Sequence, residues 1–199
     1  MRKYTFSLLL LLLLAILPMQ VFAKTTGAPV REYPAPLLIT NAGQGPGGKM
    51  ARLLIGQARV LKLGTDFFYK SEPKEDDLSD LDYSCLLIVI GSTDKGLGAS
   101  GITIDDEIDR LKRVIKHAKD IDLPIIALLL EKDKRSTIKT NSNERCIDLI
   151  CPASDWMIVV KDGNTDQRFN KISDKYDIPL TEIGSAMEFM KVSKQIFVK

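Results

Sequence analysis

The chain has 199 residues, of which 45% are hydrophobic and 27% charged, so it is long and apolar enough for one domain with a full core. Its 28 basic and 26 acidic residues nearly balance, which argues against nucleic acid or an anionic membrane surface as the main partner. The spacing of the three cysteines and the presence of only one histidine, His117, argue against a zinc site.

The N-terminus has the layout of a secretory signal peptide. Arg2 and Lys3 form a short positive segment, residues 6–17 are an almost unbroken apolar run, and a small-x-small pattern ends at Ala23. The run is too short to cross a bilayer comfortably, so we expect cleavage after residue 23 and a secreted or periplasmic chain with no further transmembrane span. An uncleaved membrane anchor is the alternative.

After an irregular tether at residues 24–35, short apolar segments alternate with segments of helical periodicity. We expect strands at residues 37–40, 65–69, 85–90, 125–130, 156–160 and 179–182. Apolar residues at helical spacing predict helices that begin near residues 50, 104, 143, 167 and 185. The segment 85–90 is apolar on both faces, which is typical of a central parallel strand covered by helices on both sides.

This alternation predicts a single doubly wound α/β domain over residues 36–199, because parallel strands need crossover connections. We expect a mostly parallel, five-stranded sheet in the order 2-1-3-4-5, flavodoxin- or Rossmann-like, with helices on both faces. In such sheets ligands bind at the carboxyl ends of the strands, where the winding direction reverses. Here that point lies between the first and third predicted strands, and a glycine-rich loop follows each of them.

The first loop, residues 43–50, reads Gly-Gln-Gly-Pro-Gly-Gly-Lys-Met and satisfies both the Rossmann glycine spacing and the P-loop spacing. Met50 stands where a P-loop has the hydroxyl that binds magnesium, and Pro46 removes one backbone N–H from a phosphate cradle. We therefore expect a small polar or anionic ligand rather than a nucleotide, with no cofactor and no metal. A plain structural turn is the alternative.

The second loop, residues 91–101, offers hydroxyls, one ammonium group and flexible amides in front of a helix. That combination suits a carboxylate or a phosphate, although a mobile surface loop would have the same composition. The candidate ligand contacts are Asn41, Gln44, Gly45, Lys49, Ser92, Thr93, Lys95 and, after a later strand, Asp162.

No complete catalytic set emerges from the pattern. His117 lies on the long helix away from the loops, where we expect a solvated side chain, so Ser92 has no evident base. The run 162–166 alternates oxygen ligands but lacks the glycine and glutamate of a calcium loop, which favours a turn followed by a helix. Cys85 is expected to be a buried hydrophobe, and a Cys146–Cys151 disulfide would require a helix end between the two residues.

Three segments resemble a family of secreted bacterial domains of unknown function: residues 38–44 (LITNAGQ), 91–101 and 152–155 (PASD). The resemblance spans roughly residues 36–183. It implies a flavodoxin- or Rossmann-like α/β domain and carries no established reaction or catalytic residue.

We therefore expect an exported domain that binds a small polar or anionic molecule in the crevice between residues 41–49 and 91–101, without catalysing a reaction. A metal-dependent hydrolase or transferase that uses Asp94, Asp162 or a bound metal is one alternative. A module that binds another envelope protein is the other.

Overall fold

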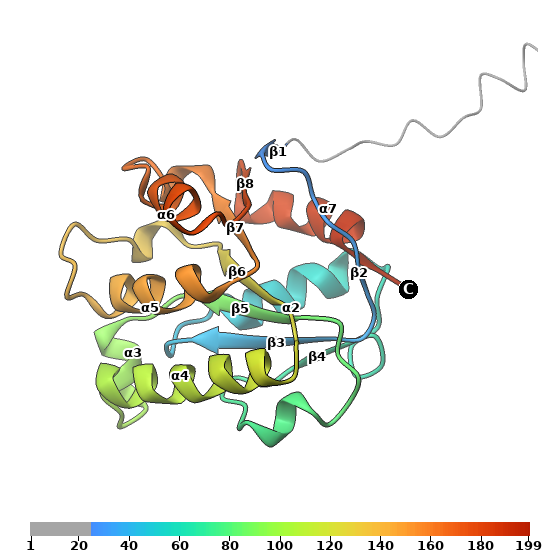
Figure 1. Ribbon diagram of the computed structural model, residues 1–199, viewed down its shortest axis with the longest axis horizontal. Helices are drawn as coiled ribbons and strands as arrows, with labels where there is room; N and C mark the ends of the chain where they lie inside the picture. Colours follow the sequence, from blue (N-terminus) through green and yellow to red (C-terminus); the bar gives the residue numbers. More distant parts are fainter. Residues whose placement is uncertain (1–24) are drawn as a thin grey trace, which may run out of the picture.

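One central sheet of seven strands organises residues 25–199, the part of the chain that the computed structural model describes; the predicted signal peptide lies outside the described residues. The strand order is β1-β8-β7-β6-β5-β3-β4 (Figure 1). In chain order the strands are β1 (Thr25–Gly27), β3 (Leu37–Ala42), β4 (Phe67–Tyr69), β5 (Leu86–Ile90), β6 (Ile125–Leu129), β7 (Trp156–Val160) and β8 (Leu180–Ile183). All neighbours are parallel except β1, which is antiparallel to β8.

Two further strands form a small parallel sheet near the C-terminus, where β2 (Tyr33–Pro34) pairs with β9 (Phe197–Val198). The helices of the described residues are α2 (Gly47–Gln57), α3 (Asp94–Ala99), α4 (Ile104–Asp120), α5 (Ser142–Ile150), α6 (Arg168–Tyr176) and α7 (Ala186–Ile196). Single 3-10 turns are η1 (Asp76–Leu78), η2 (Lys132–Lys134), η3 (Cys151–Ala153) and η4 (Lys161–Gly163). None of these helices is long and apolar enough to cross a membrane.

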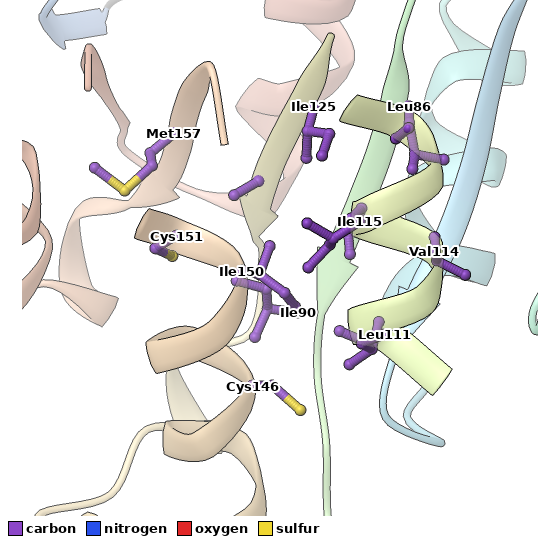
Figure 2. Packing of buried hydrophobic residues seen from close by; sticks show 14 of the residues in the cluster. Leu86, Ile90, Leu111, Val114, Ile115, Ile125, Cys146, Ile150, Cys151 and Met157 are labelled. Atoms are coloured by element: carbon purple, nitrogen blue, oxygen red, sulfur yellow. The ribbon is translucent and has the colours of Figure 1, made fainter. Parts of the chain in front are cut away.

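The two faces of the sheet have separate hydrophobic cores. Helices α4, α5 and α6 cover one face, and α2 and α7 cover the other (Figure 1). Figure 2 shows the first core, where Leu111, Val114 and Ile115 of α4 pack over Leu86 of β5 and Ile125 of β6. Because both faces are covered, the central strands are apolar throughout, and β5 and β6 are buried at every residue.

The predicted α/β class, the mostly parallel sheet and the helices on both faces are confirmed. The prediction of five strands is wrong. Strands β4-β3-β5-β6-β7 follow the expected order 2-1-3-4-5, but β8 continues the sheet and β1 adds an antiparallel edge. The expected tether at residues 24–35 contains β1 and β2, which have no alternating apolar pattern because each pairs along an edge through its backbone.

All three cysteines are buried and free. Cys85 begins the buried run of β5, as expected, and burial raises the pKa of its thiol to about 12. Cys146 and Cys151 both pack into the core beneath α5 and form no disulfide (Figure 2). Five residues apart on a helical path, they face different directions even though α5 ends between them.

Thr181 fastens the N-terminal strand to the sheet. The indole Nε1 of Trp156 donates to Thr181 Oγ1 at 2.9 Å, and the same hydroxyl donates to the carbonyl oxygen of Ala28 at 2.7 Å. The first bond joins β7 to β8, and the second joins β8 to the residue that follows β1; Thr181 is fully buried. One hydroxyl therefore adds a side-chain link to the backbone pairing of β1, β8 and β7.

Replacing Thr181 by Val keeps the shape of the side chain and removes both hydrogen bonds. We expect Thr181→Val to lower the free energy of unfolding by about 1–3 kcal/mol, because the Trp156 N–H and the Ala28 carbonyl lose a partner. Urea unfolding followed by the fluorescence of Trp156, the single tryptophan, measures this change. Thr26→Val, on the exposed face of the same edge, is the control and should leave stability within about 0.5 kcal/mol. Equal stabilities of the two variants would contradict the assignment.

Candidate functional site

The carboxyl ends of β3, β5, β6, β7 and β8 meet at one edge of the sheet, and the predicted loops lie there. The first loop turns at Gly43, whose φ is +85°, and α2 begins at Gly47. The second predicted loop, residues 91–101, contains the short helix α3. Thr93 caps this helix by accepting from the Gly96 N–H at 3.0 Å. Two glycines within α3 lower its helical propensity, which is why the pattern resembled a loop.

The two glycine loops pack directly against each other. A Cβ on Gly45 would overlap the carbonyl oxygen of Gly91, and a Cβ on Gly43 would overlap the side chain of Ser92. The absence of side chains at these positions therefore allows one backbone to approach the other. As a result, the expected crevice between the loops is filled by the loops themselves.

Two predicted contacts, Asn41 and Ser92, support the loops from inside. The side-chain oxygen of Asn41 accepts from the Gly48 N–H at 2.8 Å, and its Nδ2 donates to Tyr69 Oη at 3.1 Å. The backbone N–H of Ser92 donates to Asn143 Oδ1 at 3.0 Å. Both side chains are buried. Asn41 thereby holds the start of α2, and the Ser92 side chain packs against Gly43 of the first loop.

The other predicted contacts are spread along the edge. Gln44 donates to Glu72 at 2.8 Å, while Lys49 and Lys95 are exposed. Asp162 lies farther along the edge, in η4, where its Oδ2 is 3.5 Å from Lys132 Nζ. The structure thus brings Gln44, Gly45, Ser92 and Thr93 to the packed loops and leaves Asp162 at another part of the edge.

A buried ion pair fixes the first loop to α4. The Glu107 carboxylate has no exposed surface and accepts from the Gly43 N–H at 2.7 Å. Arg110 donates to the two oxygens of Glu107 at 2.7 and 2.9 Å and to the carbonyl oxygen of Asn41 at 2.9 Å. The end of β3 is therefore tied to the helix that follows the second loop.

A second buried carboxylate fixes the loops after β6 and β7. Glu144 is fully buried and accepts from Arg135 Nε at 2.8 Å, from Arg168 Nη1 at 2.6 Å and from the Ser136 N–H at 2.9 Å. Arg135 also contacts the carbonyl oxygen of Gly163, in η4. As predicted, residues 162–166 form a turn that leads into a helix, α6. Residues 25–199 contain no group of three or more potential metal ligands.

At the same edge of the sheet, a cavity of about 370 Å³ lies between α2, α7 and the segments that follow β6 and β7. Its apolar walls are Met50 of α2, Leu130 and Val160 after β6 and at the end of β7, and Ala186 of α7. Polar groups complete the lining: residues 131–133, Asp162, Gly184 and Ser185. Asp162 is the predicted site residue that lines it.

Glu131 is the polar residue of this cavity that reaches farthest inward. Its side chain is only 16% exposed, and its Oε2 is buried without a hydrogen-bond partner in the described part of the chain. A Cβ on Gly91 would lie 3.0 Å from this oxygen and a Cβ on Gly47 3.5 Å from it, so the carboxylate adjoins both glycine loops. Burial raises the pKa of Glu131, and Asp133 adds to that effect while Lys134 opposes it.

Sequence reasoning missed Glu131, although a signal was present. A carboxylate directly follows the apolar run 125–130, so it had to lie at the carboxyl edge beside the loops. Its surroundings differ from those of the other two glutamates. Glu107 and Glu144 are saturated by donors, whereas the nearest cation to Glu131, Lys134 Nζ, is 3.9 Å from its Oε1.

His117 lies in the last turn of α4, far from the glycine loops, where it is partly exposed. Its Nε2 is 3.2 Å from Ser79 Oγ, on the segment after η1. Among residues 25–199 no carboxylate bonds to this imidazole, so the Ser–His contact lacks the third group that would orient a catalytic base.

The sheet, the closed switch point and the cavity define a doubly wound α/β protein with an open ligand-sized space at its carboxyl edge. The chain belongs to the family described as Domain of unknown function (DUF6305), whose model matches residues 34–197.

Solved structures match the chain at low similarity. The response regulator RcsB of Salmonella typhimurium is 13% identical, with a TM-score of 0.33, over 81% of this chain and 67% of its own. A mutant of the esterase AlinE4 is 11% identical, with a TM-score of 0.31, over 78% of this chain and 77% of its own. AlinE4 itself, described as an SGNH-hydrolase family esterase, is 12% identical with a TM-score of 0.29 and the same coverage. No curated protein matches the sequence.

The contact between the glycine loops can be tested with a single methyl group. We expect Gly45→Ala to destabilise the fold by about 3 kcal/mol, because the new Cβ meets backbone at Gly91 that cannot rotate away. Gly98→Ala is the matched control: this glycine is exposed in α3, with open space around it, and the change should stabilise by up to about 1 kcal/mol. Urea unfolding of both variants gives the comparison, and a neutral Gly45→Ala would show that the loops do not pack in this way.

Proposed function

We propose that this domain is exported and binds a small polar molecule at the carboxyl edge of its sheet, in the cavity beside Glu131. One observation carries the proposal: of three glutamates that lie inward at this edge, two are saturated by hydrogen bonds, whereas the third, Glu131, lines a cavity and has one oxygen, Oε2, without a hydrogen-bond partner in residues 25–199. A desolvated carboxylate without a donor costs free energy, and such costs concentrate at functional sites.

The shape and composition of the cavity support the same function. Its volume of about 370 Å³ lies within the range of small-molecule sites, roughly 300–1,000 Å³. Apolar walls with a few polar groups are the usual lining of such sites. Asp162 and Glu131 are the proposed polar contacts. Gln44, Gly45, Lys49, Thr93 and Lys95 stay predictions for a ligand that extends over the loops, and Asn41 and Ser92 would act by holding those loops.

Export is supported by the charge, length and cleavage pattern of residues 1–23. The three buried thiols are compatible with an oxidising compartment because solvent oxidants cannot reach them in the folded chain.

The unpartnered carboxylate should reduce stability at neutral pH. The pKa of Glu131 is raised in the folded state, so the folded chain holds the proton of this carboxyl group more tightly than the unfolded chain does. As the pH rises from 4.5, the ordinary pKa of a glutamate, through the raised pKa, the ionised Glu131 therefore lowers the free energy of unfolding. We expect Glu131→Gln to be more stable than the parent near pH 7.5 and equally stable below pH 4.5. Urea unfolding at both pH values is the measurement. Glu32→Gln, at an exposed position, should match the parent at both, and a Glu131→Gln variant that is less stable at neutral pH would contradict this description.

Native mass spectrometry of the protein from its own cells tests ligand binding and export together. We expect a small-molecule mass that is lost on denaturation, a chain beginning at Lys24, and recovery from the extracytoplasmic fraction. Glu131→Gln, expressed in the same cells, should carry less of the ligand, whereas Glu32→Gln should carry as much as the parent.

The outcomes separate the two parts of the proposal. A full-length chain in the cytoplasm would overturn export without affecting the cavity. A bare mature protein, with no added mass in either the parent or the control, would overturn tight ligand binding. One stoichiometric protein partner in its place would favour the interaction module.

A further inference from the structure

We infer that the ligand of the Glu131 cavity is a small organic cation: an ammonium group carried on a short apolar body. The inference rests on the proposed function and specifies the chemical class of its ligand. Three properties of the cavity lead to it, namely its charge, the state of its hydrogen-bond donors and the distribution of its apolar walls.

The charges that line the cavity favour a positive ligand. Glu131, Asp133 and Asp162 contribute three carboxylates, and Lys132 contributes one ammonium group. That lysine is already paired with Asp162, at 3.5 Å. The lining is therefore negative overall, and an anion would be repelled unless it displaced this pair.

Part of the hydrogen-bonding capacity that could hold an anion is already in use. Helix α7 begins at the cavity, where the Ser185 hydroxyl accepts from the Glu188 N–H at 3.3 Å and the Glu188 carboxylate accepts from the Gly184 N–H at 2.8 Å. In α2, the Gly48 N–H donates to Asn41. The protein's own side chains thus occupy one N–H in the first turn of each helix, and the Glu188 carboxylate adds a negative charge at the start of α7, which disfavours an anion there.

The Glu131 carboxylate, in contrast, lacks the donor that an ammonium group would supply. Its Oε2 is buried beside Gly47 and Gly91 and has no hydrogen-bond partner in residues 25–199, so the oxygen left for a ligand in the cavity is Oε1, which lies 3.9 Å from Lys134 Nζ, beyond hydrogen-bond distance. Charge-assisted hydrogen bonds to a partly buried carboxylate are among the stronger polar interactions. Met50, Leu130, Val160 and Ala186 line the same cavity, so the apolar part of the ligand has walls to contact.

Three probes of equal length test the charge of the ligand: pentylammonium, 1-pentanol and pentanoate. Calorimetric titration of the mature protein near neutral pH should show millimolar binding of pentylammonium, at least about tenfold tighter than either of the others. Amide chemical shifts of Met50 and Ala186 should move with pentylammonium, which locates it in the cavity. Acidification through the raised pKa of Glu131 should weaken this binding, because protonation removes the negative charge.

Variants identify the carboxylate that is responsible. Glu131→Gln should weaken pentylammonium binding about tenfold or more, and leave 1-pentanol unchanged, because only the charged hydrogen bond is lost. Glu32→Gln should bind as the parent does. Urea unfolding of each variant verifies that the fold is retained.

Several results would overturn the inference: pentanoate binding as tightly as pentylammonium, an unchanged affinity in Glu131→Gln, or no pentylammonium binding up to about 50 mM. Each is distinguishable from failure of the proposed function. A co-purified anionic or neutral ligand that depends on Glu131 would keep the proposed function and refute the cation. Absence of both a co-purified ligand and probe binding would refute the two together.

Discussion

Glu107 places a carboxylate on the inner side of α4, where water does not reach it. A buried charge of this kind is tolerated only when hydrogen-bond donors surround it, and here the backbone of Gly43 and the guanidinium of Arg110 do so. Arg110 also holds the carbonyl oxygen of the last part of β3. The position of the first loop, and with it the packing of the loop against Gly91, follows from the need to keep this carboxylate satisfied.

Closure of the switch point moves the open space at the carboxyl edge toward β6, β7 and β8. Glu144 binds Arg135 and Arg168 and so holds the segments that follow β6 and β7. Two carboxylates at this edge, those of Glu107 and Glu144, are thus satisfied by donors, whereas Glu131 lines the cavity and its Oε2 has no hydrogen-bond partner in residues 25–199.

The sequence was most informative where hydrophobic patterning decides the structure. The segments 85–90 and 125–130 are apolar throughout, and both are central strands, because only a strand covered on both faces has that pattern. It was least informative at edges and short elements. Thr25–Gly27 pairs with β8 mainly through its backbone, and no local pattern marks a strand whose partner is more than 150 residues away.

The candidate site was predictable only in its general position. Glycines at residues 43, 45 and 91 allow another group to approach the backbone closely. The sequence pattern is the same whether that group is a ligand or a second loop of the protein. The carboxylates of Glu107, Glu131 and Glu144 differ in their partners, which come from distant parts of the chain. Only the folded arrangement distinguishes the two that hold the structure from the one that is available.

The burial of the three thiols determines how the protein can be oxidised. Burial raises the pKa of Cys85 and Cys146 to about 12 and that of Cys151 further, so none of them is present as the reactive thiolate while the core is intact. Oxidation must then proceed through unfolded molecules. An odd number of thiols means that such molecules can be trapped by cross-linking to one another, so in an oxidising environment the rate of unfolding, rather than the reactivity of any cysteine, would set how long the protein survives.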